Sequence, residues 1–181
     1  SYGSVQKVWW KCNVNPKHEW EAKIASVAKG HRCPICVGQK VSSENNLNYK
    51  YPSVAKEWHP TKNGDSYPTD YTWGSGKKVW WKCPKGDDHE WEAAIRHRTS
   101  NNSGCPFCTG NRLSKDNNLA AKFPTLAKEW HSKKNNELTP HEVMPGTKIK
   151  VWWLCNNGHE WLCSINKRTS RGQSCALCKK Q

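Results

Sequence analysis

The chain has 181 residues, with 29 Lys or Arg against 15 Asp or Glu, and its formal charge is +14. No apolar run is long enough for a transmembrane helix, and no secretory leader is visible, so we expect no membrane partner and an intracellular, non-secreted protein. The strong positive charge favours a polyanionic partner, and nucleic acid is the commonest of these.

One pattern occurs three times along the chain. Each copy contains Val-Trp-Trp-x-Cys, then His-Glu-Trp, then a pair of cysteines separated by two residues, and the copies follow one another at intervals of about 70 residues. Self-similarity at a fixed period indicates tandem repeats. We therefore predict three modules, 1–40, 44–110 and 115–181, of which the first is truncated because it lacks the helical half described below.

Each copy begins with a predicted β-hairpin. The stretch that ends in the first cysteine alternates in polarity and is rich in residues that favour strands, and the His-Glu-Trp stretch is the returning strand. The joining loops at 13–17, 84–88 and 156–158 contain the Pro, Gly, Asn and Asp residues of turns. Cysteine and histidine are therefore expected at the tip of each hairpin.

Two similar segments, 44–59 and 116–131, follow the first two cysteine pairs. Both contain an acidic residue, Asn-Asn-Leu and, further on, Ala-Lys-Glu-Trp-His. We predict short helices here, with Ser43 or Ser114 capping the first turn and Pro52 or Pro124 near the start of a second helix.

Nine of the ten cysteines join three histidines in Cys₃His sets, and Cys163 is left over. Thiolate and imidazole donors suit the tetrahedral preference of Zn²⁺, and the close cysteine pairs are typical of metal knuckles. A module of this size has a small core, so three Zn²⁺ ions are predicted as its staples, with mononuclear iron as the minor alternative. The predicted ligands are Cys12, His18, Cys33 and Cys36; Cys83, His89, Cys105 and Cys108; and Cys155, His159, Cys175 and Cys178.

The combination of Pro-x-x-Ala-Lys-Glu-Trp, Val-Trp-Trp-x-Cys, His-Glu-Trp and Cys-Pro-x-Cys resembles a repeat family of the zinc-ribbon or treble-clef type, known chiefly as a domain of unknown function. The third module departs from it with Cys175-Ala176-Leu177-Cys178 but keeps both sulfurs. The fold class expected is small, zinc-stabilised α+β: tandem zinc-ribbon or treble-clef-like modules, each a β-hairpin with zinc knuckles plus short helices. The resemblance also implies nucleic-acid binding.

A catalytic zinc is the competing hypothesis. Nucleobase deaminases require His-x-Glu, but Trp20 and its equivalents stand two residues after each histidine, and a third cysteine takes the position that a catalytic water needs. A nuclease of the treble-clef type would need a histidine that lies beside a metal without binding it. The candidates are the histidines outside the ligand sets: His31, His59, His97, His131 and His141. A spare histidine alone supplies little of the geometry that catalysis needs, and we therefore expect no enzyme.

The chain contains twelve tryptophans. We predict that most of the repeated ones fill the small cores, since aromatic burial is large per residue. The core set is Trp10, Trp20, Trp58, Trp81, Trp91, Trp130, Trp153 and Trp161. In strand alternation Trp9, Trp80 and Trp152 point to the opposite face, where exposure would let them stack on a base or sugar.

Basic residues gather before each Trp-Trp strand and between the returning strand and the cysteine pair. The predicted nucleic-acid contacts are Lys29, Arg32, Lys77, Lys78, Arg96, His97, Arg98, Lys148, Lys150, Lys167, Arg168 and Arg171. The alternatives are a solvated basic edge, lysines that discourage strand pairing, or an arginine stacked on tryptophan. Each loaded Cys₃His site carries a net charge of about −1, so about +11 remains.

These features together predict a non-catalytic tandem zinc-finger protein that binds nucleic acid. Double-stranded DNA is the preferred partner, with basic loops that contact phosphates on modules held rigid by zinc. The alternatives are a structured-RNA binder and a protein-interaction scaffold for an acidic partner.

Overall fold

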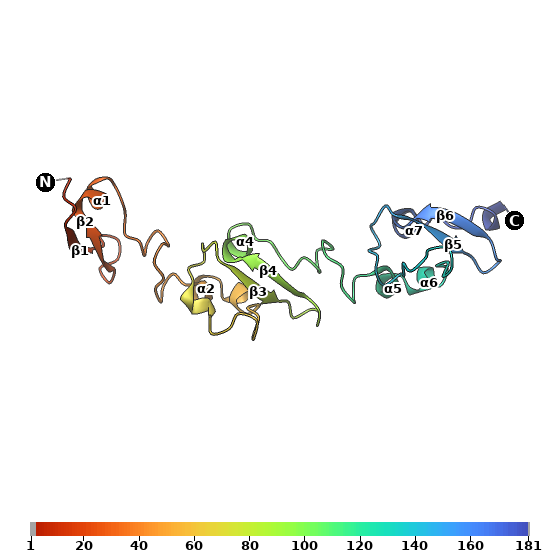
Figure 1. Ribbon diagram of the computed structural model, residues 1–181, viewed down its shortest axis with the longest axis horizontal. Helices are drawn as coiled ribbons and strands as arrows, with labels where there is room; N and C mark the ends of the chain where they lie inside the picture. The colour runs from red at the N-terminus through yellow and green to blue at the C-terminus, as the bar shows by residue number, and fades with distance from the viewer. Residues whose placement is uncertain (1–2, 181) are drawn as a thin grey trace. The chain divides into compact units, whose positions relative to one another are not determined.

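The computed structural model describes residues 3–180. Three separate two-stranded antiparallel sheets confirm the predicted hairpins (Figure 1). The strands are β1 (Lys7–Lys11) with β2 (Glu19–Lys23), β3 (Lys78–Lys82) with β4 (Glu90–Ala94), and β5 (Lys150–Leu154) with β6 (Glu160–Ser164). The register is the same in all three, because the second tryptophan of each pair lies opposite the tryptophan of His-Glu-Trp.

A short helix follows each hairpin directly: α1 (Ile24–Ala28), α4 (Ile95–Thr99) and α7 (Ile165–Arg171). The sequence pattern predicts only a strand end and a basic loop in this stretch, so these helices are a correction. In α4 the buried residues are Ile95, Arg98 and Thr99, at the i, i+3 and i+4 positions that share one helical face. This spacing turns an arginine toward the core.

The predicted helices between the cysteine pairs and the next hairpins are confirmed as α2 (Leu47–Lys50), α3 (Pro52–Ala55), α5 (Leu119–Lys122) and α6 (Pro124–Ala127). Pro52 and Pro124 begin the second helix of each pair, as expected. The caps differ from the prediction: Asn46 and Asn118, not Ser43 and Ser114, accept the first-turn backbone N–H. Two single 3₁₀ turns, η1 (Pro68–Asp70) and η2 (Cys178–Lys180), complete the elements.

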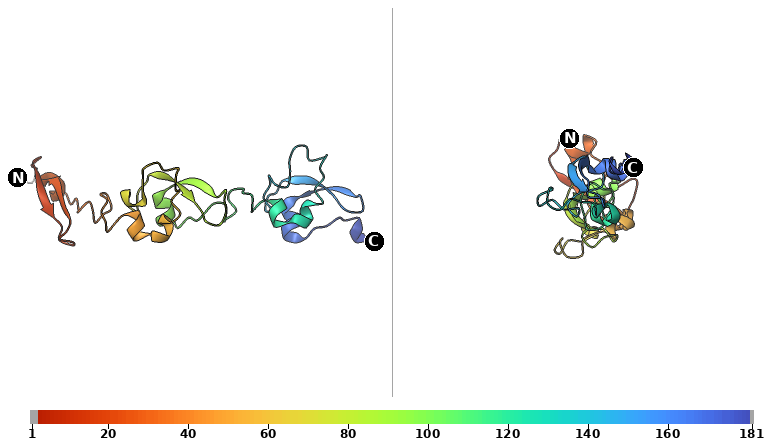
Figure 2. Two further views of the ribbon diagram at one scale, coloured as in Figure 1. Left: turned by 90° about the horizontal axis from the view of Figure 1, so that it is seen from below. Right: turned by 90° about the vertical axis from the view of Figure 1, so that its right-hand side faces the viewer.

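The segment that contains α3 covers the outer edge and one face of the β3–β4 hairpin (Figure 2). Trp58 packs edge to face on Trp81, with ring centroids 5.7 Å apart. The backbone N–H of His59 donates to the carbonyl of Trp80, and the N–H of Lys82 donates to the carbonyl of Glu57. The same contacts recur at β5, from Glu129, Trp130 and His131 to Trp152, Trp153 and Leu154.

The buried cores follow from this packing. Trp81 and Trp153 are completely buried, and Trp91 nearly so. The core of the third repeat contains Leu119, Val143, Val151, Trp153, Cys163 and Ile165. The leftover Cys163 is thus a core residue. Trp10 and Trp20 of the first hairpin are only half-buried.

The chain forms two compact units. One contains the residues up to Lys82 together with Glu90–Ser103, and the other contains Cys83–His89 and the residues from Gly104 onward. The second metal cluster therefore belongs to the unit of the third repeat. The module boundaries predicted from the sequence stay a prediction.

Every helix in residues 3–180 is far too short to cross a lipid bilayer, since the longest, α7, has 7 residues.

Candidate metal centres and basic surface

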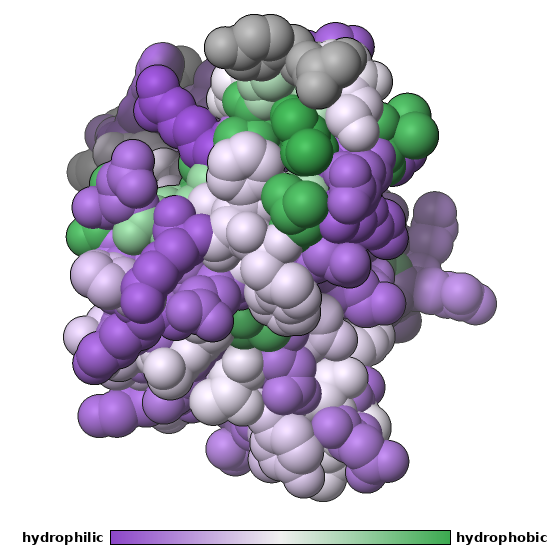
Figure 3. Space-filling view, turned by 90° about the vertical axis from the view of Figure 1, so that its left-hand side faces the viewer, coloured by the Kyte–Doolittle hydropathy of each residue, from purple (hydrophilic) through white to green (hydrophobic). Residues whose placement is uncertain are grey.

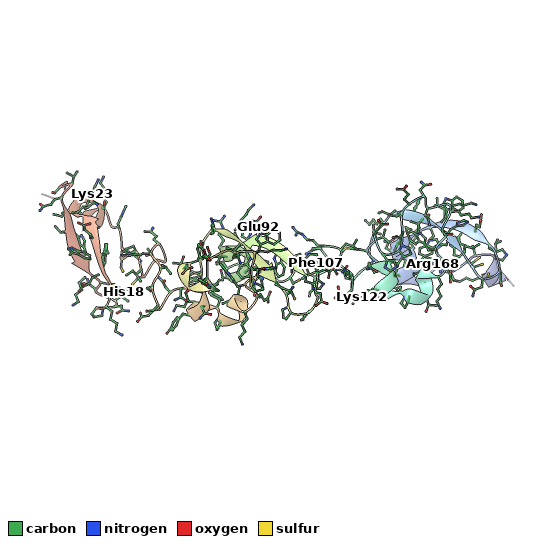
Figure 4. All side chains as sticks on the ribbon, turned by 60° about the horizontal axis from the view of Figure 1, so that its bottom comes forward. His18, Lys23, Glu92, Phe107, Lys122 and Arg168 are labelled. Atoms are coloured by element: carbon green, nitrogen blue, oxygen red, sulfur yellow. The ribbon has the colours of Figure 1, made fainter. Side chains whose placement is uncertain are left out.

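The structure brings the twelve predicted ligands together as three Cys₃His clusters, in which the donor atoms lie within 4.8 Å of one another. In each repeat the first cysteine follows the outgoing strand and the histidine precedes the returning one. Between Cys12 and His18, and likewise in the other copies, a backbone hydrogen bond from the cysteine N–H to the histidine carbonyl closes the loop. Figure 4 shows His18 at the opposite end of its hairpin from Lys23.

The spacing of the donor atoms fits zinc. Tetrahedral coordination with Zn–S bonds of about 2.3 Å separates the sulfurs by about 3.7 Å, whereas a disulfide needs about 2.05 Å. The Sγ atoms of Cys12 and Cys36 lie 3.5 Å apart, and those of Cys83 and Cys108 lie 3.7 Å apart. All ten cysteines are free thiols. Each cluster is therefore suited to hold one Zn²⁺.

The imidazole nitrogen that faces the sulfurs is Nδ1 in every cluster. In the first cluster it lies 3.3 Å from Sγ of Cys36 and 3.7 Å from Sγ of Cys33. The corresponding distances are 3.6 and 3.7 Å for His89 and 3.3 to 3.6 Å for His159. Nε2 therefore points away from the metal position and is available to a second partner.

The cysteines of the first cluster have divergent pKa values. A hydrogen bond from the backbone of Asn15 lowers the pKa of Cys12 to about 7, and the hydrogen bond shared with Cys12 raises the pKa of Cys36 to about 12. The cluster without metal thus retains protons on part of its sulfurs. Because a metal-bound cysteine is a thiolate, Zn²⁺ binding releases those protons.

The outer nitrogen of the second ligand histidine meets a carboxylate from the following segment. Nε2 of His89 lies 2.9 Å from Oδ1 of Asp116, and Ser114 also donates to that oxygen. These hydrogen bonds, first that of Ser114 and then that of His89, lower the pKa of Asp116. A carboxylate on the second nitrogen fixes the tautomer and orientation of a zinc-bound histidine.

The first cluster has the same arrangement with an amide in between. Oε2 of Glu44 lies 3.6 Å from Nε2 of His18, and Nδ2 of Asn15 lies 3.2 Å from that nitrogen and donates to Glu44 at 2.8 Å. Gly86 occupies the position of Asn15 in the second repeat. A Cβ there would lie 2.6 Å from Nε2 of His89, so glycine leaves the room that the direct contact with Asp116 requires.

An asparagine beside each carboxylate binds the preceding cysteine knuckle. Nδ2 of Asn45 donates to the carbonyls of Ile35 and Lys40, both at 2.8 Å. Asn117 donates in the same way to Phe107 and Arg112. The acidic-Asn-Asn triplet therefore organises the metal site that precedes it as well as the helix that it caps. The sequence shows that the triplet is repeated, but it does not show that the triplet binds the ligand histidine and the cysteine knuckle.

Arg98 and Arg168, two of the predicted nucleic-acid contacts, lie in the cores. The guanidinium of Arg98 lies 4.9 and 5.0 Å from the ring centroids of Trp81 and Trp91, and Nη2 donates to Glu57 at 2.8 Å. Arg168 repeats this arrangement with Trp153, Trp161 and Glu129. Only 6% and 8% of their surface is exposed. Burial removes both from a binding surface and fits the alternative of arginine stacked on tryptophan.

The other ten basic candidates are exposed. Those of the second repeat meet at the end of the β3–β4 hairpin opposite Cys83. Lys78 pairs with Ala94, the N–H of Ile95 donates to the carbonyl of Lys77, and Arg96 follows on α4. The equivalent place holds Lys148, Lys150 and Lys167 in the third repeat, and Lys7 and Lys23 in the first. We call this recurring group the basic end of the hairpin.

The tryptophans on the outer face differ between repeats. Trp9 is 74% exposed, as expected. Trp80 and Trp152 are half-buried, because Nζ of Lys62 and Nζ of Lys134 each lie 4.6 Å from a ring centroid. Lys62 also pairs with Glu90 and, with Lys82 and His59, lowers the pKa of Glu90 to about 2.

Of the histidines outside the ligand sets, His59 and His131 are buried. Nε2 of His59 lies 3.2 Å from Oε1 of Glu90, and its Nδ1 accepts backbone N–H groups of Thr61 and Lys62. His131 has equivalent partners, with Glu160 at 2.8 Å. These contacts give both histidines a structural role. His31, His97 and His141 are exposed and belong to none of the metal clusters found in residues 3–180.

A hairpin, a short helix and a four-donor Cys/His cluster, repeated three times, define a tandem zinc finger of small α+β type. A family model described as a probable treble clef zinc finger domain matches residues 1–39, 54–111 and 126–181, and the chain belongs to this family. The resemblance seen in the sequence is thereby confirmed. No curated protein matches the chain.

Proposed function

We propose that this protein binds nucleic acid, with duplex DNA as the preferred form, through the basic ends of its hairpins. The observation that carries the proposal is the recurrence of exposed basic side chains, lysines in all three zinc-finger repeats and Arg96 in the second, at one place on the hairpin. Repetition of a positive group at equivalent positions suits a polymer whose phosphates repeat along its length, and each neutralised phosphate releases condensed counterions.

The residues proposed for the contacts are the exposed candidates at the basic ends, Lys77, Lys78, Arg96, His97, Lys148, Lys150 and Lys167, together with three exposed candidates outside them, Lys29, Arg32 and Arg171. Lysine meets phosphate mainly as a point charge, while Arg96 and Arg171 have the fork geometry that can address guanine. Zinc supplies folding free energy to each repeat and so fixes the hairpin that presents these side chains. We propose no catalytic role for the metal, because all four donors come from the protein and a structural zinc site is closed in this way.

The test is binding of the zinc-loaded chain to random duplex DNA, single-stranded DNA and folded RNA of equal length across a salt series. Duplex preference with a steep salt dependence supports the proposal. Replacing Lys77, Lys78 and Arg96 with alanine should lower the slope of log K against log salt by about 0.9 for each phosphate that the variant no longer neutralises.

A matched control removes the same charge elsewhere. Lys56, Lys122 and Lys128 are exposed and lie outside the basic ends, so their triple alanine variant should bind with nearly the slope of the unaltered chain. Equally reduced slopes for the two triple variants would mean that net charge alone drives binding. Preference for folded RNA would favour the RNA alternative, and absence of binding at low salt would favour an acidic protein partner.

A further inference from the structure

The sequence Lys-Val-Trp-Trp-Lys occurs twice as a strand, in β1 and in β3, with different surroundings. In β3 the valine and the second tryptophan are buried, and the last lysine is half-buried. In β1 the same valine and tryptophan, Val8 and Trp10, are only half-buried, and Lys11 is exposed. Five identical residues in the same hairpin register cannot cause this difference. It comes from what covers the strand.

The outer edge of β3 is fully bonded to the segment that precedes it. The N–H of Trp80 donates to Oδ1 of Asn63 at 2.8 Å, and its carbonyl accepts from Nδ2 of Asn63 and from the N–H of His59. The N–H of Lys82 donates to the carbonyl of Glu57 at 2.7 Å. The edge of β5 has the same four hydrogen bonds, made by Asn135, His131 and Glu129. In the second and third repeats, the segment that precedes the hairpin therefore bonds to the outer edge of its first strand.

No such partner contacts β1 within the described part of the chain. The outward N–H and carbonyl of Trp9 and the N–H of Lys11 are the equivalents of the bonded groups of Trp80 and Lys82. An unpaired strand edge readily accepts an additional extended segment. Figure 3 looks onto the first repeat, where apolar side chains drawn in green are open to solvent. Val5, Trp9 and Val14 are exposed residues of this repeat.

A cavity of about 500 Å³ lies on the same hairpin, lined by Trp10, Trp20, Val27, His31 and Arg32 among others. The second repeat holds the side chain of Arg98 between the equivalent tryptophans, and Arg98 in turn binds Glu57. Val27 stands in the position of Arg98, three residues after the first isoleucine of the helix. Within the described residues, the first repeat therefore shows neither an equivalent of the covering segment nor the arginine that binds this segment in the second repeat.

We propose that β1 and its tryptophan-lined cavity form a docking site for a polypeptide segment that resembles residues 51–66 of this chain. Such a segment contains Ala-Lys-Glu-Trp-His and, four residues further on, an asparagine. The tryptophan of the segment would pack edge to face on Trp10, its backbone would pair with Trp9 and Lys11, and its asparagine would bind Trp9. The inference goes beyond nucleic-acid binding and does not depend on it.

The test adds a synthetic peptide of residues 51–66 to the zinc-loaded full chain and follows hydrogen exchange of the backbone amides of Trp9 and Lys11. We expect saturable protection of these amides, while those of Trp80 and Lys82 do not change because their own segment covers them. A peptide with Trp58→Ala should bind at least about tenfold more weakly, since buried aromatic anchors dominate such contacts. A peptide with Asn63→Ala should leave the Trp9 amide unprotected.

A variant of the chain supplies an independent test. It predicts a gain of affinity, which a misfolded variant could not produce. Val27→Arg restores the arginine found in the other repeats and should raise the affinity for the Glu57 peptide about tenfold through a charge-assisted hydrogen bond. The gain should vanish with a Glu57→Gln peptide.

Three outcomes would overturn the proposal. They are no protection of β1 at peptide concentrations up to its solubility, equal binding of the Trp58→Ala peptide, and protection of the Lys11 amide by duplex DNA but not by peptide. Protection that rises with protein concentration in the absence of peptide would assign the edge to a second copy of the chain instead.

Discussion

Nε2 of His89 lies 2.9 Å from Oδ1 of Asp116, although the two residues are separated by 27 positions and Asp116 begins the segment that leads into the next hairpin. The carboxylate of Asp116 thus completes the second metal site, although Asp116 belongs to the third predicted module. Because such a partner orients the histidine and raises its basicity as a ligand, metal affinity in the second cluster should depend on it.

Asp116→Ala is expected to weaken Zn²⁺ binding in the second cluster about 10- to 100-fold, the usual effect of removing a carboxylate behind a zinc-bound histidine. Competition with a chromophoric chelator measures the change. Asp87→Ala is the matched control, since Asp87 is an exposed acid of the same loop and belongs to none of the metal clusters. Equal effects of both variants would reduce the contact to a general effect of charge.

Gly86→Ala should disturb the same cluster by a different route. The added Cβ would approach Nε2 of His89 to 2.6 Å, so the imidazole must move away from Asp116. We expect a loss of zinc affinity of at least about tenfold, comparable with that of Asp116→Ala, and little further loss when the two changes are combined. Gly104→Ala is the control, because nothing lies within 4 Å of its Cβ position. Additive losses of zinc affinity would show that the clash at Gly86 does not act through the contact between His89 and Asp116.

The third cluster should lose its metal first. No acidic side chain pairs with the histidine His159 among the residues that the structure describes, whereas His18 and His89 each have one. Stepwise addition of a chelator, followed by the indole NMR signals of Trp153 and Trp81, should show the third repeat unfolding at a lower chelator concentration. Restoring Zn²⁺ should reverse the change, because the binding free energy of the metal is also folding free energy. Simultaneous loss at all sites would contradict the role given to the carboxylates.

Arg98→Met should destabilise the second repeat by about 3 kcal/mol. The change removes a guanidinium stacked between two tryptophans and leaves Glu57 without its partner in a partly buried position. Hydrogen exchange of the β3 and β4 amides reports on this repeat alone. Arg96→Met, on the exposed face of the same helix, should change stability by less than about 0.5 kcal/mol and instead weaken binding to DNA. Normal stability of Arg98→Met would show that the stacked arginine contributes nothing to the fold.

The sequence predicted the hairpins, the helices that precede the second and third of them, and the twelve donor residues that gather in three clusters, because each has a local pattern that the chain repeats. It did not predict α1, α4 and α7, since five to seven residues show too little periodicity to separate a helix from a strand end. The burial of Arg98 was missed for a different reason. An arginine is normally exposed, and its partner Glu57 lies 41 residues earlier. Long-range pairing of this kind has no signature in spacing.

The carboxylate and asparagine clamps also place a limit on how the chain can be divided. A fragment cut after the second cysteine pair, at residue 110, would keep the four donors of the second cluster and discard Asp116 and Asn117, which orient its histidine and bind its knuckle. A fragment that continues through Asn118 keeps them. The functional unit for expression, transplantation or design of one finger is therefore offset from the sequence repeat, and it extends a few residues into its neighbour.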